Sequence, residues 1–397
     1  MYPILTLKPG KEGALGFHHP WVFSGALQGI PREIEQGAIV RVLDQQGKIV
    51  GTGTYSTHSM IAVRIFDFAE CTLDQEWFAA RLRRAEKRRR WFDLGVGDPV
   101  AGYRVIFGES DGIPGLVVDR YADVLVLQVA TAGTEFLKEL IVKALVDFYA
   151  PRAIIERSDL PVRREEGMNE AVGVLYGDGT VDRVEFREGD LRFVADVKSG
   201  QKTGFFLDQR ELRRRLMHYA ADRGTVLNLF SYTGSFAVAA LKAGARSVHN
   251  IDGSQSALNQ IAAQLELNQL ASSSATTECT DVFNWLSKHD DPSYDMVIVD
   301  PPALMKSHRD AETGSKAYHF LNRAALRLMR TDGIFVTSSC SAHYSEDDFA
   351  VMLRRASVQA GVTLDILETV RQSADHPTSI YFPESLYLKS FICQVRR

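Results

Sequence analysis

Apolar and polar positions follow two different patterns along the chain. Near the N-terminus, short apolar runs separated by glycine predict strands over residues 39–43, 49–55 and 61–66. From about residue 190 onward, apolar runs of strand length alternate with segments of helical spacing. This alternation predicts a doubly wound, mostly parallel α/β sheet, which binds its ligands at the carboxyl ends of its strands.

The C-terminal part contains the most regular elements. Strands are expected over residues 226–229, 247–251, 296–299, 334–338 and 386–395, and helices over residues 235–243, 254–267, 319–329 and 347–360. In the middle of the chain, strands are expected over residues 103–107, 116–119, 124–129, 153–156 and 184–186, with helices over residues 74–91 and 135–149. The middle part therefore reads as a small α+β layer.

Length and composition indicate a soluble protein of several domains. The chain has 397 residues, which suggests about two or three domains, and the predicted bounds are 1–72, 73–189 and 190–397. Hydrophobic residues make up 45% and charged residues 24%, as in ordinary globular proteins. Neither a membrane-length apolar stretch nor a signal-peptide pattern is found, so a cytoplasmic location is expected.

The cysteines and the charge distribution limit which metal sites, disulfides and polyanion-binding surfaces can be expected. Cys71, Cys279, Cys340 and Cys393 have no CxxC or Cys/His spacing, so we expect neither a metal site nor a disulfide scaffold. The net charge of −4 gives no general support for binding a polyanion. Basic clusters at residues 81–90 and 213–215 could each face RNA phosphates or form an ordinary solvated helix face.

Two turn-rich segments, one near the N-terminus and one in the middle of the chain, carry polar side chains. The loop over residues 18–25 contains His19 and Trp21, and Trp21 could stack on a nucleic-acid base or plug one end of a small barrel. Glu109 and Asp111 are interpreted as turn residues, because nothing near them in the sequence supplies catalytic chemistry.

Acidic residues follow successive strands of the C-terminal part. The first strand leads into a loop with a single glycine, Gly234, which is a poor phosphate cradle and disfavours a dinucleotide. Asp252 follows the next strand and suits ribose hydroxyls, and Asp281 could accept a hydrogen bond from an adenine amino group. Asp281 comes one strand after Asp252, and Asp300 ends the fourth strand. Any one of these acids could also cap the following helix.

Cys340 follows the apolar run at residues 334–337, within Ser339-Cys340-Ser341. A thiolate at a strand end of an open sheet could act as a nucleophile, while a lone cysteine beside apolar residues could equally be a small buried hydrophobe.

These strand-end residues together resemble the class I S-adenosylmethionine-dependent methyltransferases. A closer resemblance, to the ribosomal RNA large subunit methyltransferase I family, covers essentially the whole chain. It is carried by His19-Pro-Trp-Val-Phe-Ser-Gly25, Gly108-Glu-Ser-Asp-Gly-Ile-Pro-Gly115, Gln201-Lys-Thr-Gly-Phe-Phe-Leu-Asp-Gln-Arg210, Asn228-Leu-Phe-Ser-Tyr-Thr-Gly-Ser-Phe236, Asp300-Pro-Pro302, Ser339-Cys-Ser341, Asp375-His-Pro377 and Pro383-Glu-Ser-Leu-Tyr-Leu-Lys389. The resemblance implies a PUA-type RNA-binding domain, a central strand-strand-helix-strand-strand domain, and a Rossmann-like methyltransferase domain that makes 5-methylcytosine in 23S ribosomal RNA. Family members also tend to be homodimers.

The resemblance also implies roles for individual residues. Cys340 would be the nucleophile that adds to cytosine carbon 6, and Asp300 would hydrogen-bond the activated base. The expected cofactor-binding residues are Phe205, Gln209, Phe230, Tyr232, Gly234, Asp252, Asp281, Val282, Asp300 and Pro301. The expected RNA-binding residues are His19, Trp21, Lys202 and Arg210. Phe205 could instead be a core aromatic, and Asp208 a helix cap.

Two departures and two rival functions accompany this interpretation. Leu304 stands where the family commonly has an aromatic, and Gly253 also differs from the usual residue.

Asp300-Pro-Pro could instead activate an exocyclic nitrogen for methylation, leaving Cys340 structural. The protein could also be a non-catalytic RNA-binding ribosome-assembly factor that keeps the methyltransferase domain as a scaffold.

Overall fold

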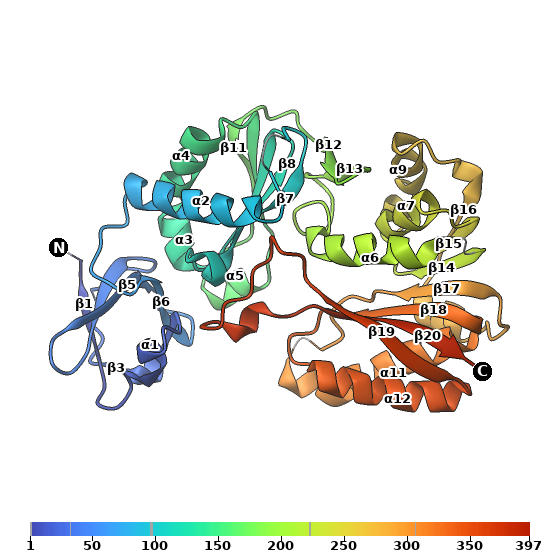
Figure 1. Ribbon diagram of the computed structural model, residues 1–397. Coiled ribbons are helices and arrows are strands. Elements are labelled where there is room, and N and C mark those ends of the chain that lie inside the picture. The colour runs from blue at the N-terminus through green and yellow to red at the C-terminus, as the bar shows by residue number, and fades with distance from the viewer. Residues whose placement is uncertain (1, 32, 96–97, 222–223, 306) are drawn as a thin grey trace. The chain divides into compact units, whose positions relative to one another are not determined.

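The computed structural model describes residues 2–31, 33–95, 98–221, 224–305 and 307–397 (Figure 1). The chain forms two compact units. The first comprises Met1–Arg187, Val194–Leu207 and Ala374–Ser385, and the second comprises Glu188–Phe193, Asp208–Ser373 and Leu386–Arg397. Each unit therefore joins segments that are far apart in the sequence. The domain bounds at residues 72 and 189 stay predictions.

The first sheet contains the glycine-punctuated strands of the N-terminus. Its order is β2-β6-β5-β4-β1-β3. The strands are β1 (Ile4–Leu7), β2 (Trp21–Phe23), β3 (Leu27–Gln28), β4 (Ile39–Leu43), β5 (Ile49–Tyr55) and β6 (Ile61–Asp67), with helix α1 at Gly13–Gly16 and a 3-10 turn at Ser24–Ala26. The three predicted strands are confirmed as β4, β5 and β6. Gly53 of β5 is required by packing, because a Cβ there would lie 2.3 Å from the carbonyl oxygen of Arg64.

One expectation for this sheet is wrong. The sequence predicts a loop over residues 18–25, but Trp21–Phe23 pairs with β6 as strand β2. The strand is only three residues long and buries only Val22, so no alternating pattern marks it in the sequence.

The second sheet of the same unit corresponds to the predicted α+β layer with one correction. The expected strand at residues 184–186 belongs to a separate sheet, and the layer contains instead an unpredicted strand at Ala171–Gly177. The strands of the layer run in the order β11-β10-β9-β8-β7. They are β7 (Gly102–Phe107), β8 (Leu116–Tyr121), β9 (Val124–Val129), β10 (Ala153–Ser158) and β11 (Ala171–Gly177), with helices α2 (Gln75–Arg90), α3 (Ala132–Phe136), α4 (Lys138–Tyr149) and α5 (Val162–Glu165) and a 3-10 turn at Gly108–Asp111. Phe78 and Leu82 of α2 pack into the core of this layer with Tyr103 and Ile141. A short two-stranded sheet of β12 (Arg183–Glu188) and β13 (Leu191–Asp196) follows.

The second unit contains the doubly wound sheet. Its order is β16-β15-β14-β17-β18-β20-β19. The strands are β14 (Thr225–Leu229), β15 (Ser247–Asp252), β16 (Ala275–Cys279), β17 (Tyr294–Val299), β18 (Met329–Ser339), β19 (Thr363–Arg371) and β20 (Lys389–Arg396). The first five are parallel, whereas β20 runs antiparallel to both β18 and β19.

Helices cover both faces of this sheet (Figure 1). The helices are α6 (Arg210–Ala220), α7 (Ser235–Lys242), α8 (Gln255–Leu258), α9 (Ile261–Leu267), α10 (Val282–Leu286), α11 (Ala311–Arg327) and α12 (Glu346–Ala360), with 3-10 turns at Leu207–Gln209, Ser272–Ser274, His308–Asp310 and Pro383–Ser385. In Figure 1, α6 and α7 lie on one face, and α11 and α12 lie on the other. Because β14 and β17 are buried on both sides, their sequences are mostly apolar rather than alternating, with the buried Asn228 as an exception in β14.

Several details of this unit differ from the sequence predictions. Helix α11 begins at Ala311 rather than at residue 319, because its first turns are polar and include Gly314. That glycine is needed for close packing, since a Cβ would lie 2.4 Å from Cγ of Met305. Strand β19 is not predicted, because it is an edge strand with little buried surface. The expected helix at 254–267 is two helices, and the last strand begins at residue 389 instead of 386.

Candidate active site

The predicted strand-end residues of the second unit gather at one edge of its sheet. The neighbouring strands β16, β15, β14, β17 and β18 are parallel, so their carboxyl ends meet at that edge. The residues that follow them are, in spatial order, Asp281, Asp252, the loop at residues 230–234, Asp300 and Cys340. The sheet topology therefore places the expected cofactor acids on one side and the expected reaction centre on the other.

The loop after β14 has an unusual backbone. Phe230, Tyr232 and Gly234 all have positive φ angles, of 59°, 47° and 81°. A positive φ is uncommon for a non-glycine residue and is maintained only where the surroundings fix it, often at binding sites. One such restraint is Asp252, whose Oδ2 accepts a hydrogen bond of 2.8 Å from the Tyr232 backbone N–H.

Two buried hydroxyls in this loop fit a polar ligand. In the described part of the chain, Ser231 Oγ and Thr233 Oγ1 have no hydrogen-bond partner. Buried polar atoms in folded proteins nearly always have a hydrogen-bond partner. Two unsatisfied hydroxyls in one loop therefore indicate that a polar group from outside the chain binds there. S-adenosylmethionine presents hydroxyl, ammonium and carboxylate groups that meet this need. Neither residue was predicted, because neither has a diagnostic spacing in the sequence.

The two acids on the cofactor side differ in their surroundings. Asp252 is half-buried, and its Oδ1 accepts a 2.8 Å hydrogen bond from the Ser254 N–H. Asp281 is exposed, and its Oδ1 caps helix α10 by accepting from the Asn284 N–H at 2.8 Å. Asp281 therefore caps helix α10, which is the alternative role that the sequence left open for it. A carboxylate in this position still has lone pairs that can accept a hydrogen bond from a ligand.

Apolar groups accompany these acids. Val282 is buried in the core of the unit. Phe230 and Phe283 meet edge to face, with ring centroids 6.4 Å apart.

The side of the expected reaction centre is built around Asp300. Its Oδ1 accepts a 2.8 Å hydrogen bond from Nε2 of the buried Gln209. Oε1 of Gln209 has no partner among the described residues, so it is a further acceptor available to a ligand. Pro301 is buried, and its carbonyl oxygen lies 3.9 Å from Sγ of Cys340.

Cys340 is half-buried, and a network of hydroxyls fixes the strand end around it. The Tyr318 hydroxyl lies 3.0 Å from Oγ of both Ser339 and Ser341. The Met305 N–H donates to Ser341 Oγ at 3.0 Å. Burial raises the pKa of Tyr318, so its hydroxyl keeps its proton. The thiol therefore sits on a rigid strand end rather than on a loose loop.

Lys389 lies beside Cys340 on the neighbouring strand. It pairs with Ser339 in the β18–β20 register, and its Nζ donates to the carbonyl oxygens of Ser341, at 2.7 Å, and Tyr344. Burial lowers the pKa of Lys389 to about 8, and this effect outweighs the attraction of Cys340 and Glu346. Lys389 closes one of the motifs in the sequence, but that motif alone predicts no role for it.

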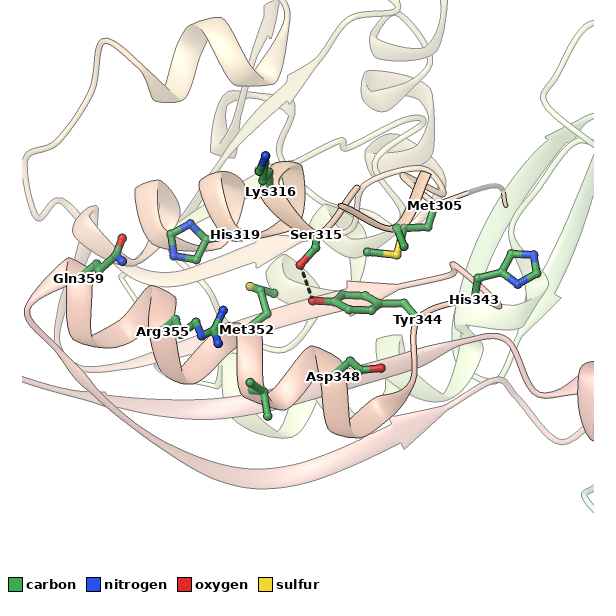
Figure 2. A pocket seen from close by; sticks show the side chains of 12 residues that line it. Met305, Ser315, Lys316, His319, His343, Tyr344, Asp348, Met352, Arg355 and Gln359 are labelled. Carbon is green, nitrogen blue, oxygen red and sulfur yellow. Dashed lines mark hydrogen bonds between the residues drawn. The ribbon is translucent and has the colours of Figure 1, made fainter. Parts of the chain in front are cut away.

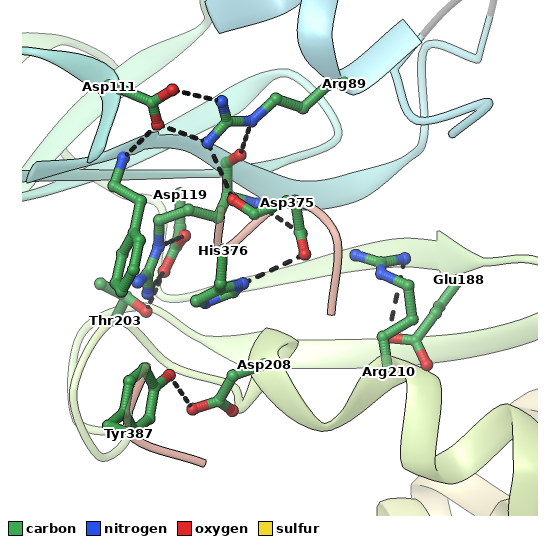
Figure 3. A network of polar contacts seen from close by, with 12 residues as sticks. Arg89, Asp111, Asp119, Glu188, Thr203, Asp208, Arg210, Asp375, His376 and Tyr387 are labelled. Atoms are coloured by element: carbon green, nitrogen blue, oxygen red, sulfur yellow. Dashed lines mark hydrogen bonds and ion pairs between the residues drawn. The ribbon is translucent and has the colours of Figure 1, made fainter. Parts of the chain in front are cut away.

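Arg210 and the basic cluster at residues 213–215 are largely engaged within the second unit. Arg213 is fully buried and binds Glu188 through two hydrogen bonds of 2.7 and 2.6 Å. Arg210 lies 3.8 Å from the same carboxylate (Figure 3). Tyr387 donates to Oδ2 of Asp208 at 2.6 Å, so Asp208 ties two distant segments together. An RNA contact by Arg210 stays a prediction.

The remaining expected residues belong to the first unit. Phe205 is buried edge-on against Phe186, as in the core alternative. Lys202 is exposed, with Nζ 4.6 Å from the centre of the Phe206 ring. Their roles toward cofactor and RNA stay predictions.

Trp21 and His19 also lie in the first unit, in an aromatic cluster. Trp21 Nε1 donates to Oε1 of Glu109 at 2.9 Å, and its ring meets Phe382 edge-on at 4.9 Å. His19 Nε2 lies 3.4 Å from Glu384. Glu109 is thus more than a turn residue, since it fixes the orientation of Trp21.

A polar network in the same unit accounts for another motif (Figure 3). Arg89 is fully buried, and its guanidinium binds both oxygens of Asp111, at 2.7 and 2.6 Å. It also donates to the carbonyl oxygen of Asp375 at 2.8 Å. Asp375 accepts from the Arg104 N–H at 2.9 Å and lies 3.1 Å from Nδ1 of His376. Within this unit, the Asp375-His-Pro motif and Asp111 are therefore structural.

A separate pocket lies between α11 and α12 (Figure 2). Its volume is about 600 Å³, and Ser315 Oγ and Tyr344 Oη face each other across 3.4 Å at its wall. None of the predicted site residues lines it.

Comparisons with known proteins define the class of this site. Residues 5–68 match the model of a PUA-like domain, and residues 160–350 match that of an S-adenosylmethionine-dependent methyltransferase. Two solved structures share the fold across 99% of this chain and 100% of theirs, at 22% identity. They are a SAM-dependent methyltransferase from Streptococcus mutans, with a TM-score of 0.82, and a methyltransferase in complex with SAH, with a TM-score of 0.83. Fold and site thus define a class I methyltransferase that uses S-adenosylmethionine.

Curated relatives identify the family. The chain is 37% identical over 398 residues to ribosomal RNA large subunit methyltransferase I of Klebsiella pneumoniae strain 342, covering 100% of this chain and 99% of the relative. It is 39% identical over 394 residues to the protein of that name from Cronobacter sakazakii, covering 98% and 99%. This chain belongs to the ribosomal RNA large subunit methyltransferase I family.

Proposed function

We propose that this protein methylates carbon 5 of a cytosine in the RNA of the large ribosomal subunit, with Cys340 as the nucleophile. The observation that carries the proposal is the juxtaposition of Cys340 and the Asp300-Pro301 strand end, where Sγ lies 3.9 Å from the Pro301 carbonyl oxygen. The RNA substrate is inferred from the names of the full-length relatives.

The chemistry requires a nucleophile because cytosine carbon 5 is itself too weakly nucleophilic. Bound S-adenosylmethionine supplies an electrophilic methyl group. The Cys340 thiolate adds to carbon 6, and the electron pair of the carbon 5–carbon 6 double bond becomes available at carbon 5. Carbon 5 would then bond to the methyl group as the methyl–sulfur bond breaks, with S-adenosylhomocysteine as the leaving group. A water molecule would take the carbon 5 proton, the carbon 5–carbon 6 double bond would form again, and the Cys340 thiolate would leave. The residues after Asp300 are Pro301-Pro302-Ala303, so no second thiol follows that strand to assist this departure.

Asp300 would orient the base. The Gln209 amide holds one of its oxygens, and the carboxylate can accept from the exocyclic amino group of cytosine or from a protonated ring nitrogen. A charge-assisted hydrogen bond of this kind favours the adduct over the free base. Because the reacting atoms lie within the ring, the cytosine must be unstacked before it enters the site.

The residues proposed to hold the cofactor follow the order of the strands. They are the loop residues Phe230, Tyr232 and Gly234, the acids Asp252 and Asp281 with Val282, and Gln209, Asp300 and Pro301, with Phe205 as an additional contact. The buried hydroxyls of Ser231 and Thr233 join this set on structural grounds.

Replacing Asp252 with alanine is expected to weaken cofactor binding by about 10- to 100-fold. The change removes the acceptor for the ribose hydroxyls and releases the Tyr232 N–H, and hydrogen bonds to a charged group are worth about 1.5–3 kcal/mol each. Calorimetric titration with S-adenosylhomocysteine measures the effect. Asp365, which forms an exposed ion pair with Arg396, supplies the control variant Asp365→Ala. Unchanged affinity in Asp252→Ala would remove Asp252 from the cofactor site.

Lys389 is proposed to stabilise the Cys340 thiolate by its positive charge. Glu346, which could compete for that charge, is engaged by Arg371 at 3.1 Å. In the described part of the chain no carboxylate forms an ion pair with Lys389. Since burial lowers the pKa of Lys389 to about 8, the ammonium is present below that pH and is lost above it.

Replacing Lys389 with methionine is therefore expected to shift the alkylation of Cys340 to higher pH. A shift of about one pH unit corresponds to ~1.4 kcal/mol of lost charge stabilisation. Alkylation by iodoacetamide is followed across pH by peptide mass spectrometry, with the exposed Cys279 as an internal reference. Lys389→Arg keeps the charge and should keep the wild-type midpoint. Equal midpoints of Cys340 alkylation in the wild type and Lys389→Met would show that Lys389 only binds the carbonyl oxygens of Ser341 and Tyr344.

The assembly and location are also part of the proposal. Among the described residues, none of the helices has both the length and the hydrophobicity needed to span a lipid bilayer. We expect a homodimer in the cytoplasm, as the family resemblance implies. Light scattering of the purified protein tests the dimer, and a monomeric mass would contradict it.

The function is tested on large-subunit RNA from a strain that lacks the protein. Purified protein and S-adenosylmethionine are added, and the modified nucleoside is mapped by mass spectrometry. The expected product is 5-methylcytidine at a single position. A methyl group on an exocyclic nitrogen would support the nitrogen-methyltransferase alternative. RNA binding without methylation would support the assembly-factor alternative.

A further inference from the structure

Helix α2 separates its basic residues into an inward and an outward set. The inward arginines Arg81, Arg88 and Arg89 form ion pairs with Asp67 or Asp111. The outward cations Arg83, Arg84, Lys87 and Arg90 are all exposed. The helical repeat places residues 83, 84, 87, 90 and 91 on one side of the helix, over a length of about 12 Å. This outward face, together with Trp91 and Phe92, is called the α2 stripe.

The charges of the α2 stripe are uncompensated. In the part of the chain that the structure describes, none of its four cations forms an ion pair or a side-chain hydrogen bond. Several exposed cations elsewhere in the chain do have acidic partners, as Arg164 has Glu170 and Lys198 has Asp182. The stripe also affects its neighbours: burial lowers the pKa of Arg88, and the charges of Arg89 and Arg84 lower it further, against the opposing effect of Asp111.

Two exposed aromatic side chains extend the stripe. Trp91 is 71% exposed and Phe92 is 53% exposed, directly after the last turn of α2. Cations near a helix C-terminus stabilise the helix dipole, which accounts for part of the charge. That effect does not account for a tryptophan and a phenylalanine left in solvent beside the cations. Large exposed aromatics of this kind mark interaction surfaces.

We propose that the α2 stripe binds a single-stranded segment of the RNA substrate. The four cations would neutralise backbone phosphates, while Trp91 and Phe92 would stack on unpaired bases. Cations that follow a backbone, joined to aromatics that accept any base, form the usual platform for single-stranded nucleic acid. The inference rests on the proposed function, since it names a second contact for the same RNA.

The test is the salt dependence of RNA binding. A fluorescent single-stranded RNA of about 12 nucleotides, within the usual range of site sizes, is titrated with the wild type and with the fourfold variant Arg83→Gln/Arg84→Gln/Lys87→Gln/Arg90→Gln, and anisotropy is recorded at several salt concentrations. Loss of four phosphate contacts should reduce the slope of log K against log salt by about 3, since each contact on a single strand contributes roughly 0.7. Trp91→Ala should weaken binding about tenfold with little change in slope.

A matched variant removes four exposed cations that already have acidic partners. These are Arg152, Arg164, Lys198 and Arg396, each changed to glutamine. The control variant should keep most of the wild-type slope. Wild-type affinity and slope in the α2 variant would overturn the inference, and so would binding of anionic phosphatidylglycerol vesicles that requires the stripe while RNA binding does not. Methylation of large-subunit RNA by the wild type is measured in parallel, so failure of the stripe and failure of the proposed function give different results.

Discussion

Replacing Cys340 with alanine is expected to lower the rate of methyl transfer by at least about 10⁴-fold, the scale of loss when a covalent nucleophile is removed from an enzyme. Without the thiolate, carbon 5 is not activated, and neither Asp300 nor the bound cofactor can replace it. Cys340→Ser should be nearly as inactive, because a neutral hydroxyl is a far weaker nucleophile. Single-turnover kinetics on large-subunit RNA measures the loss.

Controls separate the chemical step from binding. Cys279 is exposed at the carboxyl end of strand β16, and Cys279→Ala should stay within about twofold of the wild-type rate. Affinity of Cys340→Ala for S-adenosylhomocysteine should match the wild type, because the residues proposed to hold the cofactor do not include Cys340. Retention of a tenth or more of the activity would exclude the covalent mechanism, and an N-methylated product would identify the rival chemistry.

Replacing Asp111 with alanine is expected to destabilise the fold by about 3–5 kcal/mol, the cost of leaving a buried charge without its partner. Arg89 is fully buried, and Asp111 supplies both carboxylate oxygens to it. Burial alone would lower the pKa of Arg89, but Asp111 outweighs that effect and the pKa is raised. The guanidinium therefore stays charged and would be stranded in Asp111→Ala. Urea unfolding followed by tryptophan fluorescence measures the change.

Two further variants define the cause. Glu170→Ala removes the partner of the exposed Arg164 and should cost less than about 1 kcal/mol. The double variant Arg89→Met/Asp111→Leu removes both buried charges and should recover most of the stability lost in Asp111→Ala. A loss below about 1 kcal/mol in Asp111→Ala would mean that the buried pair contributes little.

The sequence predicted the parts of the fold and site that local pattern determines. Strand ends are visible because buried parallel strands are apolar runs, so the sequence alone predicts that Asp252, Asp300 and Cys340 lie at one edge of the sheet. Strand β19 could not be predicted, because an exposed edge strand has no such pattern. The start of α11 was hidden for a related reason: Gly314 packs on Met305, a contact that only the tertiary structure creates.

Parts of the site that depend on contacts between residues far apart in the chain could not be predicted from the sequence. Lys389 is one residue in a long motif, and its place beside Cys340 follows from the antiparallel pairing of β20 with β18. Ser231 and Thr233 became candidates only through the absence of partners for their buried hydroxyls among the described residues. The basic run at residues 81–90 shows the same limit, since the sequence does not separate the buried Arg89 from the exposed Arg90. Arg89 is buried because its position on the helix turns it toward Asp111, whereas the next residue, Arg90, points outward.

The central claim, a covalent bond between Cys340 and carbon 6 of the target cytosine, is tested most directly with RNA that carries 5-fluorocytidine at the mapped position. After methyl transfer, carbon 5 of this base has no proton to lose, so the Cys340 thiolate cannot leave. We predict a stable, S-adenosylmethionine-dependent protein–RNA complex, with the RNA attached to the peptide that contains Cys340. Methylation of this RNA without a covalent complex, or attachment at another residue, would contradict the mechanism.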